Sequence, residues 1–340
     1  MAAESDEQKA YLSLLNTYPS PHNGQPIRLK RTSANQFELY FQRERGLSAT
    51  DVSYIFSFVS MGVFVAYAQA CGQALGHTVV CSLTLPKQEE LRGTGPVQFG
   101  NLTVQWNSRP AESALKEAIL FRQTSRKKYT EGLSSDITAS LIRHAAERGM
   151  QLGHLDPKQA HQAIWLNQRA VFDDMFDEAV RQELDHWLRY SKQEKESKRD
   201  GLAYDCMELN GAMMKFIVKH PNVLRAPGIA QITEKYYLRT MKDASDVFYM
   251  LAPFSTERES YEVGMAVSDI WLRLSRDRYY IHPFGTIMSN HAAHHDFLKL
   301  AGIEQENATE NYLVFIFRAG RSAKPKESLR LPYDKHLIME

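Results

Sequence analysis

Residues 54–70 read YIFSFVSMGVFVAYAQA. This run has 17 residues, including two serines and one glutamine, whereas a bilayer span needs about 20 apolar residues. Apolar side chains on most faces are typical of a helix inside a core, so we expect a buried helix from about Asp51 to Leu75, ended by Gly76. A second segment, residues 259–276 (ESYEVGMAVSDIWLRLSR), has one apolar face and is long enough to pair with the first. The sequence therefore predicts a core of two helices that lie far apart along the chain, and two related halves.

Length and composition narrow the class of protein. The chain has 340 residues, enough for about two domains, and its 43% hydrophobic and 24% charged residues are ordinary for a folded globular protein. The 41 Lys and Arg residues balance 40 Asp and Glu residues and are scattered, so the basic footprint of a nucleic-acid binder is missing. Three cysteines without CxxC spacing indicate neither a disulfide framework nor a zinc site. With no signal peptide pattern at the N-terminus, we expect a cytoplasmic protein with no membrane or nucleic-acid partner.

The order of predicted elements gives two halves, residues 1–112 and residues 113–340. The first half holds a short helix over residues 7–16 and strands over residues 27–32, 36–42, 77–86 and 101–108; the second ends in a strong strand over residues 312–318 and a basic tail. Residues 190–201 are highly charged, which indicates a solvated helix end or a mobile loop. A lid over residues 175–255 is the alternative.

A polar loop, PSPHNGQP at residues 19–26, follows the first helix. It carries Ser20, His22, Asn23 and Gln25 between prolines that stiffen it. Amide side chains both donate and accept hydrogen bonds, so Asn23 and Gln25 match the alternating edge of a flavin pyrimidine ring. The alternative is a loop whose side chains satisfy their own backbone.

A second set of residues, Arg122, Thr124 and Arg126, places two guanidinium groups and a hydroxyl close together. Such groups bind a phosphate through charge-assisted and often bidentate hydrogen bonds. Arg330, before Leu331 and Pro332, adds a further cation near the C-terminus. The alternative is an exposed basic patch for the first set and a solubilising tail for Arg330.

Together these sets resemble the nitroreductase-like FMN flavoproteins, in particular the single-chain, internally duplicated branch called Acg-type NAD(P)H nitroreductases. The family's Ser-x-x-Asn-x-Gln-Pro loop is matched by residues 20–26, and its Arg-x-Thr/Ser-x-Arg motif by residues 122–126. Its Pro-x-Gly-like segment is matched by Pro283, Phe284 and Gly285, and its closing Arg-x-Pro by residues 330–332. Residues 175–255 are matched poorly, and Ile27 stands where many relatives have Trp.

The resemblance implies an α+β nitroreductase-like fold, an internally duplicated pseudo-dimer in one chain that is a monomer or a homodimer. It implies one FMN per chain, because neither motif occurs a second time, with the loop from one half and the arginine motif from the other. Ser20, His22, Asn23 and Gln25 would approach the isoalloxazine and ribityl groups, and Arg122, Thr124, Arg126 and Arg330 would hold the phosphate. His282 is a possible proton donor, because a histidine near neutral pKa suits that role.

The implied function is reduction of an electron-poor small molecule, such as a nitroaromatic or a quinone, by NAD(P)H in a ping-pong reaction of the flavin. An FMN-dependent oxidase or dehydrogenase that acts on a biosynthetic intermediate with O2 is the first alternative, and an FMN-sequestering protein is the second. We expect no metal: His291, His294 and His295 share a segment, but a surface helix capped by Asn290 explains them.

Overall fold

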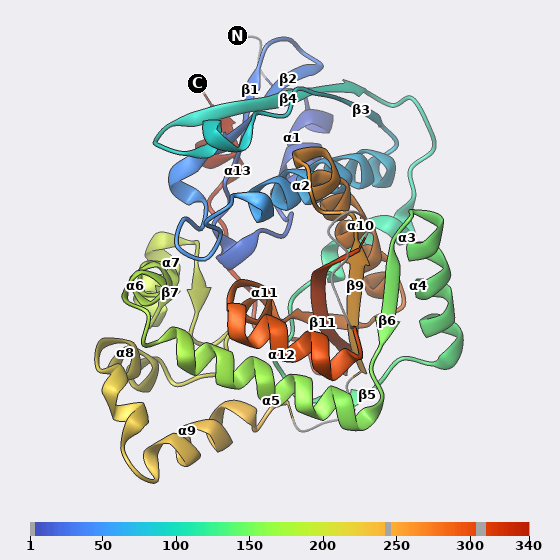
Figure 1. Cartoon of the computed structure of the whole chain (residues 1–340). Coiled ribbons are helices and arrows are strands. Elements are labelled where there is room, and N and C mark those ends of the chain that lie inside the picture. Colours follow the sequence, from blue (N-terminus) through green and yellow to red (C-terminus); the bar gives the residue numbers. More distant parts are fainter. Residues whose placement is uncertain (1–3, 242–245, 304–310, 340) are drawn as a thin grey trace. The chain divides into compact units, whose positions relative to one another are not determined.

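The computed structural model describes residues 4–241, 246–303 and 311–339 (Figure 1). By its contacts the chain divides into two units. The first unit comprises Met1–Arg122, Thr256–Arg278 and Leu329–Glu340, and the second comprises Gln123–Ser255 and Tyr279–Ser328. Each unit has its own sheet, mostly antiparallel, with helices, so the class is α+β as predicted.

The first unit is a five-stranded sheet with helices. Its strands are β1 (Ile27–Arg31), β2 (Gln36–Gln42), β3 (Thr78–Leu83), β4 (Pro96–Gln105) and β12 (Ile338–Met339), and its helices are α1 (Asp6–Leu15), α2 (Ile55–Leu75), α3 (Ser113–Phe121), α10 (Glu257–Arg276) and α13 (Tyr333–His336). Short 3-10 turns are η1 (Pro21–Asn23), η2 (Arg43–Arg45) and η3 (Gln88–Leu91). The strand order is β12-β1-β2-β4-β3, and β12 joins β1 in parallel. The C-terminus of the chain thereby completes a sheet that begins near its N-terminus.

Helix α2 is the predicted core helix, and the prediction of its C-cap is confirmed. Gly76 ends it at φ 84°, a left-handed conformation that glycine adopts without a steric cost. Among the described residues α2 is the one helix long and apolar enough to cross a membrane, yet 67% of its most apolar window is buried inside the protein. Its start is fixed by Asp51, which accepts hydrogen bonds from the backbone N–H groups of Phe56 (3.1 Å) and Ser57 (2.9 Å). These features are those of a core helix.

Helix α10 packs on α2, as the sequence predicts, and the contact is reciprocal. A Cβ at Gly62 would lie 1.9 Å from the carbonyl oxygen of Tyr261, and a Cβ at Gly264 would lie 2.0 Å from that of Val59. Each glycine is the eighth residue of its helix, and each touches the residue three before the other glycine. Two equivalent helices related by a local two-fold axis make such a contact.

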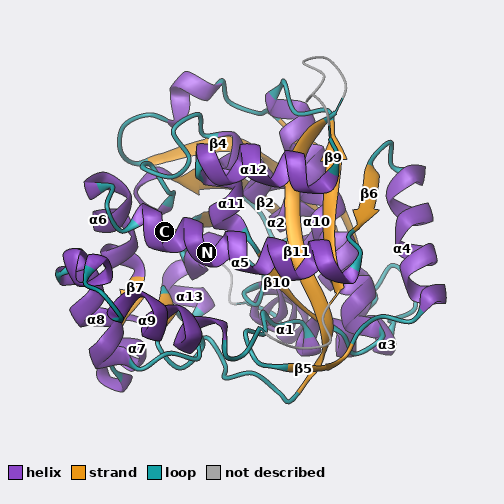
Figure 2. Cartoon of the chain, turned by 60° about the horizontal axis from the view of Figure 1, so that its bottom comes forward, coloured by secondary structure: helices purple, strands orange, loops and turns teal. Residues whose placement is uncertain are grey.

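The second unit holds a five-stranded antiparallel sheet, in which β9, β10 and β11 lie side by side (Figure 2). Four of its strands follow the order β10-β11-β9-β6: β6 (Gln151–His154), β9 (Asp246–Ala252), β10 (Tyr280–Pro283) and β11 (Tyr312–Ser322). The fifth, β5 (Tyr129–Glu131), pairs with β11 off this path, and β7 (Leu188–Arg189) and β8 (Leu202–Ala203) form a separate small pair. Its helices are α4 (Ser135–Glu147), α5 (Pro157–Asp174), α6 (Glu178–Trp187), α7 (Lys192–Lys198), α8 (Gly211–Lys219), α9 (Ile229–Leu238), α11 (Gly285–Ser289) and α12 (His291–Ala301), with a 3-10 turn η4 (Pro221–Arg225).

The two sheets repeat one topology. Along the chain each has two strands, a long helix and two more strands: β1, β2, α2, β3, β4 and β6, β9, α10, β10, β11. In both sheets the spatial order is first, second, fourth, third, and every neighbouring pair in that order is antiparallel. This repetition, with the reciprocal glycine contact, is what an internal duplication produces.

The second copy differs by an insertion between its first two strands. In the first copy residues 32–35 connect β1 to β2, whereas residues 155–245 connect β6 to β9 and contain α5 to α9. Most of residues 175–255, the stretch that the family resemblance matches poorly, lies in this insertion, while residues 246–252 form β9, the counterpart of β2. Within it the charged run forms α7, which is capped by Ser191 and mostly exposed, so the interpretation as a solvated helix fits. The division by contacts also differs from the predicted boundary at residue 112, because α10 packs on α2 and the C-terminal residues return to β1.

Candidate functional site

The polar loop after α1 has a strained backbone. His22, Asn23 and Gln25 have positive φ angles of 48°, 53° and 52°, and none of them is glycine. Each such residue costs on the order of 1 kcal/mol, and strain of this kind gathers at functional sites. The conformation is held by local bonds: the Gln25 N–H donates to Ser20 Oγ (3.0 Å), and Arg45 Nε donates to the Gly24 carbonyl (2.5 Å).

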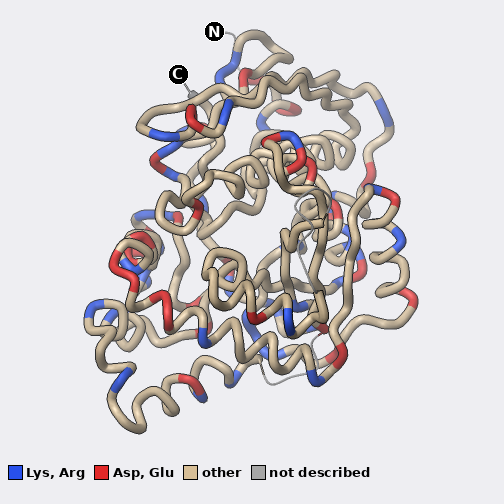
Figure 3. The backbone as a smooth tube through the Cα atoms, in the orientation of Figure 1, with Lys and Arg blue, Asp and Glu red and all other residues tan. Residues whose placement is uncertain are grey.

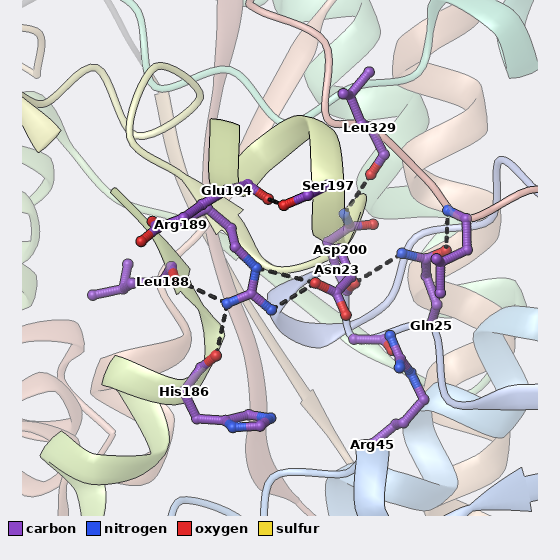
Figure 4. Close-up of polar contacts among 12 residues, drawn as sticks. Asn23, Gln25, Arg45, His186, Leu188, Arg189, Glu194, Ser197, Asp200 and Leu329 are labelled. Carbon is purple, nitrogen blue, oxygen red and sulfur yellow. Dashed lines mark hydrogen bonds and ion pairs between the residues drawn. The ribbon is translucent and has the colours of Figure 1, made fainter. Parts of the chain in front are cut away.

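The two amides of the loop bind the C-terminal segment of the same unit (Figure 4). Asn23 Nδ2 donates to the Leu329 carbonyl (3.0 Å), and the Leu331 N–H donates to Gln25 Oε1 (3.2 Å). Gln25 Nε2 donates to the Asn23 carbonyl (3.2 Å), and the Gln25 side chain is fully buried. In this structure these amide groups therefore close the loop on the chain's own backbone, which was the alternative interpretation, because buried amides require partners. Pairing of these groups with a flavin ring stays a prediction.

Arg122 and Arg330 come together in the first unit, although 207 positions separate them in the sequence. Arg122, which directly follows α3, donates from Nη2 to the Thr17 carbonyl (3.1 Å), and Arg330 donates from Nη2 to the next carbonyl, that of Tyr18. The Arg330 guanidinium also lies over the Tyr18 ring, 5.0 Å from its centroid. The carbonyls of Thr17 and Tyr18, directly before the polar loop, thus each accept a hydrogen bond from one of the two arginines.

The electrostatics of this pair are unfavourable without an anion. Burial lowers the pKa of Arg330 to about 10; the nearby Tyr18 raises it, and the charge of Arg122 lowers it further. Arg122 forms no ion pair with any described residue, and its Nε is buried without a hydrogen-bond partner there. Its guanidinium lies 4.9 Å from the ring centroid of Trp271 on α10. An anion bound here would offset the repulsion between the two charges and the burial that disfavours the charge of Arg330.

Thr124 and Arg126 belong to the second unit, where they run beside β10. Thr124 pairs with Ile281 as an isolated parallel bridge, and the Ser125 N–H donates to the Ile281 carbonyl (3.1 Å). Burial lowers the pKa of the Arg126 guanidinium, and the charge of Arg318 lowers it further. The structure thus divides the predicted phosphate set between two units: Arg122 and Arg330 in one, Thr124 and Arg126 in the other.

His282 lies on β10 beside an arginine, Arg318, whose burial the sequence analysis did not predict. Arg318 is completely buried and donates from Nε to His282 Nδ1 (3.2 Å) and from Nη2 to the Lys127 carbonyl (3.0 Å). Burial first, then the charges of Arg126 and Arg318, hold the pKa of His282 well below its usual range. Because Nδ1 accepts a hydrogen bond, the neutral ring carries its proton on Nε2. His282 is therefore suited to donating a hydrogen bond from Nε2 and not to giving up a proton as an acid. A cation inside the apolar run YLVFIFR was the available signal for Arg318.

The segment after His282 has a structural explanation. The Phe284 N–H donates to the Ile316 carbonyl (2.8 Å), its ring is buried, and it packs edge-on against His282 with centroids 5.4 Å apart. Pro283 ends β10, and Gly285 begins the short helix α11, with open space where a side chain would project. Farther along, Asn290 caps α12 as predicted, and His291 and His295 are exposed on it. The described residues contain no group of three or more His, Cys, Asp or Glu side chains placed to hold a metal.

The sequence analysis also missed a buried histidine near the C-terminus. His336 is 3% exposed and bonds the Gln25 carbonyl (2.7 Å), and Arg28 Nη1 contacts its ring nitrogens at 2.5 Å. Burial first, then the charges of Arg28 and Arg45, lower the pKa of His336 to about 3. The neutral ring thus ties the C-terminal segment to the polar loop.

This histidine predicts an acid-sensitive first unit. As the pH falls below about 6.5, the unfolded chain takes up a proton that His336 in the folded chain refuses until about 3, so stability falls over this window and is unaffected by His336 above it. We expect His336→Gln, which keeps an amide donor, to remove roughly 2 kcal/mol of the loss between about pH 6.5 and pH 4.5. Urea unfolding at a series of pH values measures this; parallel pH profiles for both proteins would contradict it.

A small cavity adjoins the loop between the strands and α2. It has a volume of about 20 Å³ and is lined by Pro21, Pro26, Phe41, Ser60 and neighbouring residues. The Ser60 hydroxyl is buried and has no hydrogen-bond partner among the described residues. A space of this size holds about one water molecule, so it does not accommodate a substrate.

Comparisons with known proteins find a distant structural likeness. No family model matches the chain, and no curated protein matches its sequence. Among solved structures, the chain is similar to the FMN-dependent nitroreductase NfnB from Mycobacterium smegmatis in complex with NADPH, with 10% identity and a TM-score of 0.39 over 65% of this chain and 96% of that one. It is also similar to the FMN and NADPH-dependent nitroreductase NfnB from sphigopyxis sp. strain HMH, with 13% identity and a TM-score of 0.40 over 67% of this chain and 99% of that one. A likeness at this level assigns no cofactor to this chain, so a cofactor site has to be argued from the chain's own residues.

Proposed function

We propose that this protein is a cytoplasmic flavoprotein that binds FMN without a covalent bond and uses NAD(P)H to reduce an electron-poor small molecule, such as a nitroaromatic or a quinone. The proposal starts from one observation. Arg122 and Arg330 are held close together on consecutive carbonyls of the first unit, and Arg122 has no acidic partner among the described residues. Two cations that repel each other at a partly buried site are suited to a dianionic group such as a phosphomonoester.

The residues present fit the phosphate of FMN. The orphaned Nε of Arg122 is an unused donor, and the neighbouring guanidinium of Arg330 carries a charge that burial disfavours. Arg330 lies over the ring of Tyr18 and Arg122 over the ring of Trp271, and these contacts restrict both side chains, so little side-chain freedom would be lost on binding. The strained loop next to them presents Ser20, whose hydroxyl accepts from the Gln25 N–H, and His22.

In the proposed reaction the chain's residues bind and orient. FMN, if bound, would supply the redox chemistry between the nicotinamide and the acceptor. Arg122 and Arg330 would hold the phosphate end, and the rigid loop would limit how the remainder of the cofactor lies. His336 bonds the Gln25 carbonyl and so joins the C-terminal segment to the loop, and Arg45 donates to the Gly24 carbonyl. These two contacts would keep the loop in one conformation.

The test is a visible absorption spectrum of the purified protein, followed by anaerobic addition of NADH or NADPH. We expect a flavin band that bleaches with one nicotinamide and returns when a quinone is added. A flavin band that persists would contradict the reductase and favour an oxidase with its own donor, or an FMN-sequestering protein. No flavin band after incubation with FMN would overturn the proposal of an FMN site.

A further inference from the structure

The inserted segment of the second unit exposes large apolar side chains beside cations. Phe216 on α8 is 54% exposed, and Ile229 and Ile232 on α9 are 37% and 65% exposed. The core does not need them, because α8 and the turn η4 bury other residues, Met214, Val218 and Leu224, in a local cluster. The outward apolar residues therefore call for an explanation outside the fold.

The charge of the same segment is one-sided. Residues 210–241, which we name the basic segment, contain five cations, Lys215, Lys219, Arg225, Lys235 and Arg239, and one acid, Glu234 (Figure 3). All five cations are exposed, and Glu234 is engaged by the indole N–H of Trp165 on α5 (2.8 Å). The whole chain has a formal charge of only +1, so this segment concentrates positive charge that the rest of the chain balances.

Apolar and basic residues share one face of α9. Ile229, Ile232 and Lys235 follow one another at intervals of three residues on α9, and Arg239, the C-cap residue, extends the same stripe four residues after Lys235. On α8 the exposed Phe216 lies between Lys215 and Lys219. Lys219 forms an ion pair with Asp185 (2.7 Å) at a site where both remain partly exposed.

We propose that the basic segment is a docking surface for an anionic lipid bilayer, on which α9 lies with Ile229 and Ile232 in the interface. Isoleucine and phenylalanine enter the boundary between headgroups and acyl chains, and flanking Lys and Arg residues bind anionic headgroups. Trp165, which contacts α9 through Glu234, is 42% exposed. Tryptophan is enriched at the interface between membrane and water. An acidic protein would match the charge, but the combination of exposed isoleucines, an exposed tryptophan and flanking cations is the one typical of a helix that lies in a bilayer interface, so the bilayer is the occupant that the residues favour. This contact adds a membrane surface to a chain whose sequence predicts no membrane partner, and it does not depend on FMN.

The test is sedimentation of the full chain with vesicles of phosphatidylcholine alone or with about 30 mol% phosphatidylglycerol. We expect at least about tenfold stronger partitioning onto the anionic vesicles, with loss of binding at high salt. Ile232→Ser, which removes apolar area without a change in charge, and Lys235→Gln should each weaken partitioning by roughly fivefold. Val80→Ser on β3, a matched control at a site 52% exposed in the first unit, should leave it unchanged.

Two outcomes overturn the proposal. The first is absence of binding to anionic vesicles at low salt; salt-sensitive retention on immobilised polyglutamate would then assign the basic segment to an acidic protein. The second is vesicle binding that Ile232→Ser and Lys235→Gln do not weaken, or that Val80→Ser weakens equally, which would place the contact elsewhere. Circular dichroism of each variant establishes that it is folded before partitioning is compared.

Discussion

Gly62→Ala is expected to destabilise the protein by at least about 3 kcal/mol, or to prevent its folding. The added methyl group would lie 1.9 Å from the carbonyl oxygen of Tyr261, and because this oxygen belongs to a helix backbone it has no side-chain freedom with which to move aside. The helices α2 and α10 would have to separate, which would disturb the packing around both. Gly264→Ala should have a similar effect, because its methyl group would meet the carbonyl of Val59 at 2.0 Å. Urea unfolding followed by circular dichroism measures the loss.

Gly285→Ala provides the matched control. Gly285 has no atom within 4 Å of the position of an added Cβ, so the same substitution there should change stability by less than about 0.5 kcal/mol. Equal stability of Gly62→Ala and Gly285→Ala would show that α2 and α10 do not cross at the glycines. A large effect at Gly62 with none at Gly264 would contradict the reciprocal contact on which the argument for duplication depends.

Arg330→Met is expected to weaken FMN binding by roughly 10- to 100-fold while leaving the cofactor-free protein as stable as before or more stable. The two effects have opposite signs for one reason. In the cofactor-free protein the Arg330 charge is disfavoured by burial and by Arg122, whereas a bound phosphate would neutralise both costs. Methionine retains an apolar stem against Tyr18. Quenching of flavin fluorescence measures affinity, and urea unfolding without FMN measures stability.

The control variants distinguish the loss of a phosphate contact from a general effect of reduced net charge on FMN affinity. Arg258→Met removes one cation at an exposed position, where Arg258 pairs with Glu262 at 2.7 Å, and should leave FMN affinity unchanged. Arg122→Met should act like Arg330→Met, and the double variant should lose less than the sum of the single losses if both residues hold the same anion. Arg126→Met tests the second-unit part of the predicted phosphate set in the same assay. Unchanged affinity in Arg122→Met and Arg330→Met would contradict the proposed phosphate site.

Much of the local structure is readable in the sequence. The apolar run at 54–70, the glycine after it and the alternating strands at 27–42 predict α2, its cap and the first two strands, because these signals depend on neighbours only a few residues away. The cap of α12 at Asn290 is predicted for the same reason. The motif residues were also recognisable, since a short loop with two amides and clustered arginines are local patterns.

Contacts between residues that are far apart in the sequence were decided by the tertiary structure. No local pattern indicates that Leu329 and Leu331 bind the amides of Asn23 and Gln25, that Arg330 joins Arg122, or that Arg318 fixes the tautomer of His282. The sequence also places Arg122 and Arg126 in one motif, while the contacts assign them to different units.

The amino-acid sequence by itself indicated the core helices α2 and α10, the strands of the first sheet and the side chains that have chemistry to offer, because propensity, periodicity and capping act within a few residues. The repeated strand order of the two sheets, the crossing of α2 and α10 at two glycines, and the burial that shifts Arg330 and His336 were decided only by tertiary structure. Burial and the distance between charges depend on three-dimensional packing. The residues next to Arg330 or His336 in the sequence therefore do not indicate which distant side chains these residues contact.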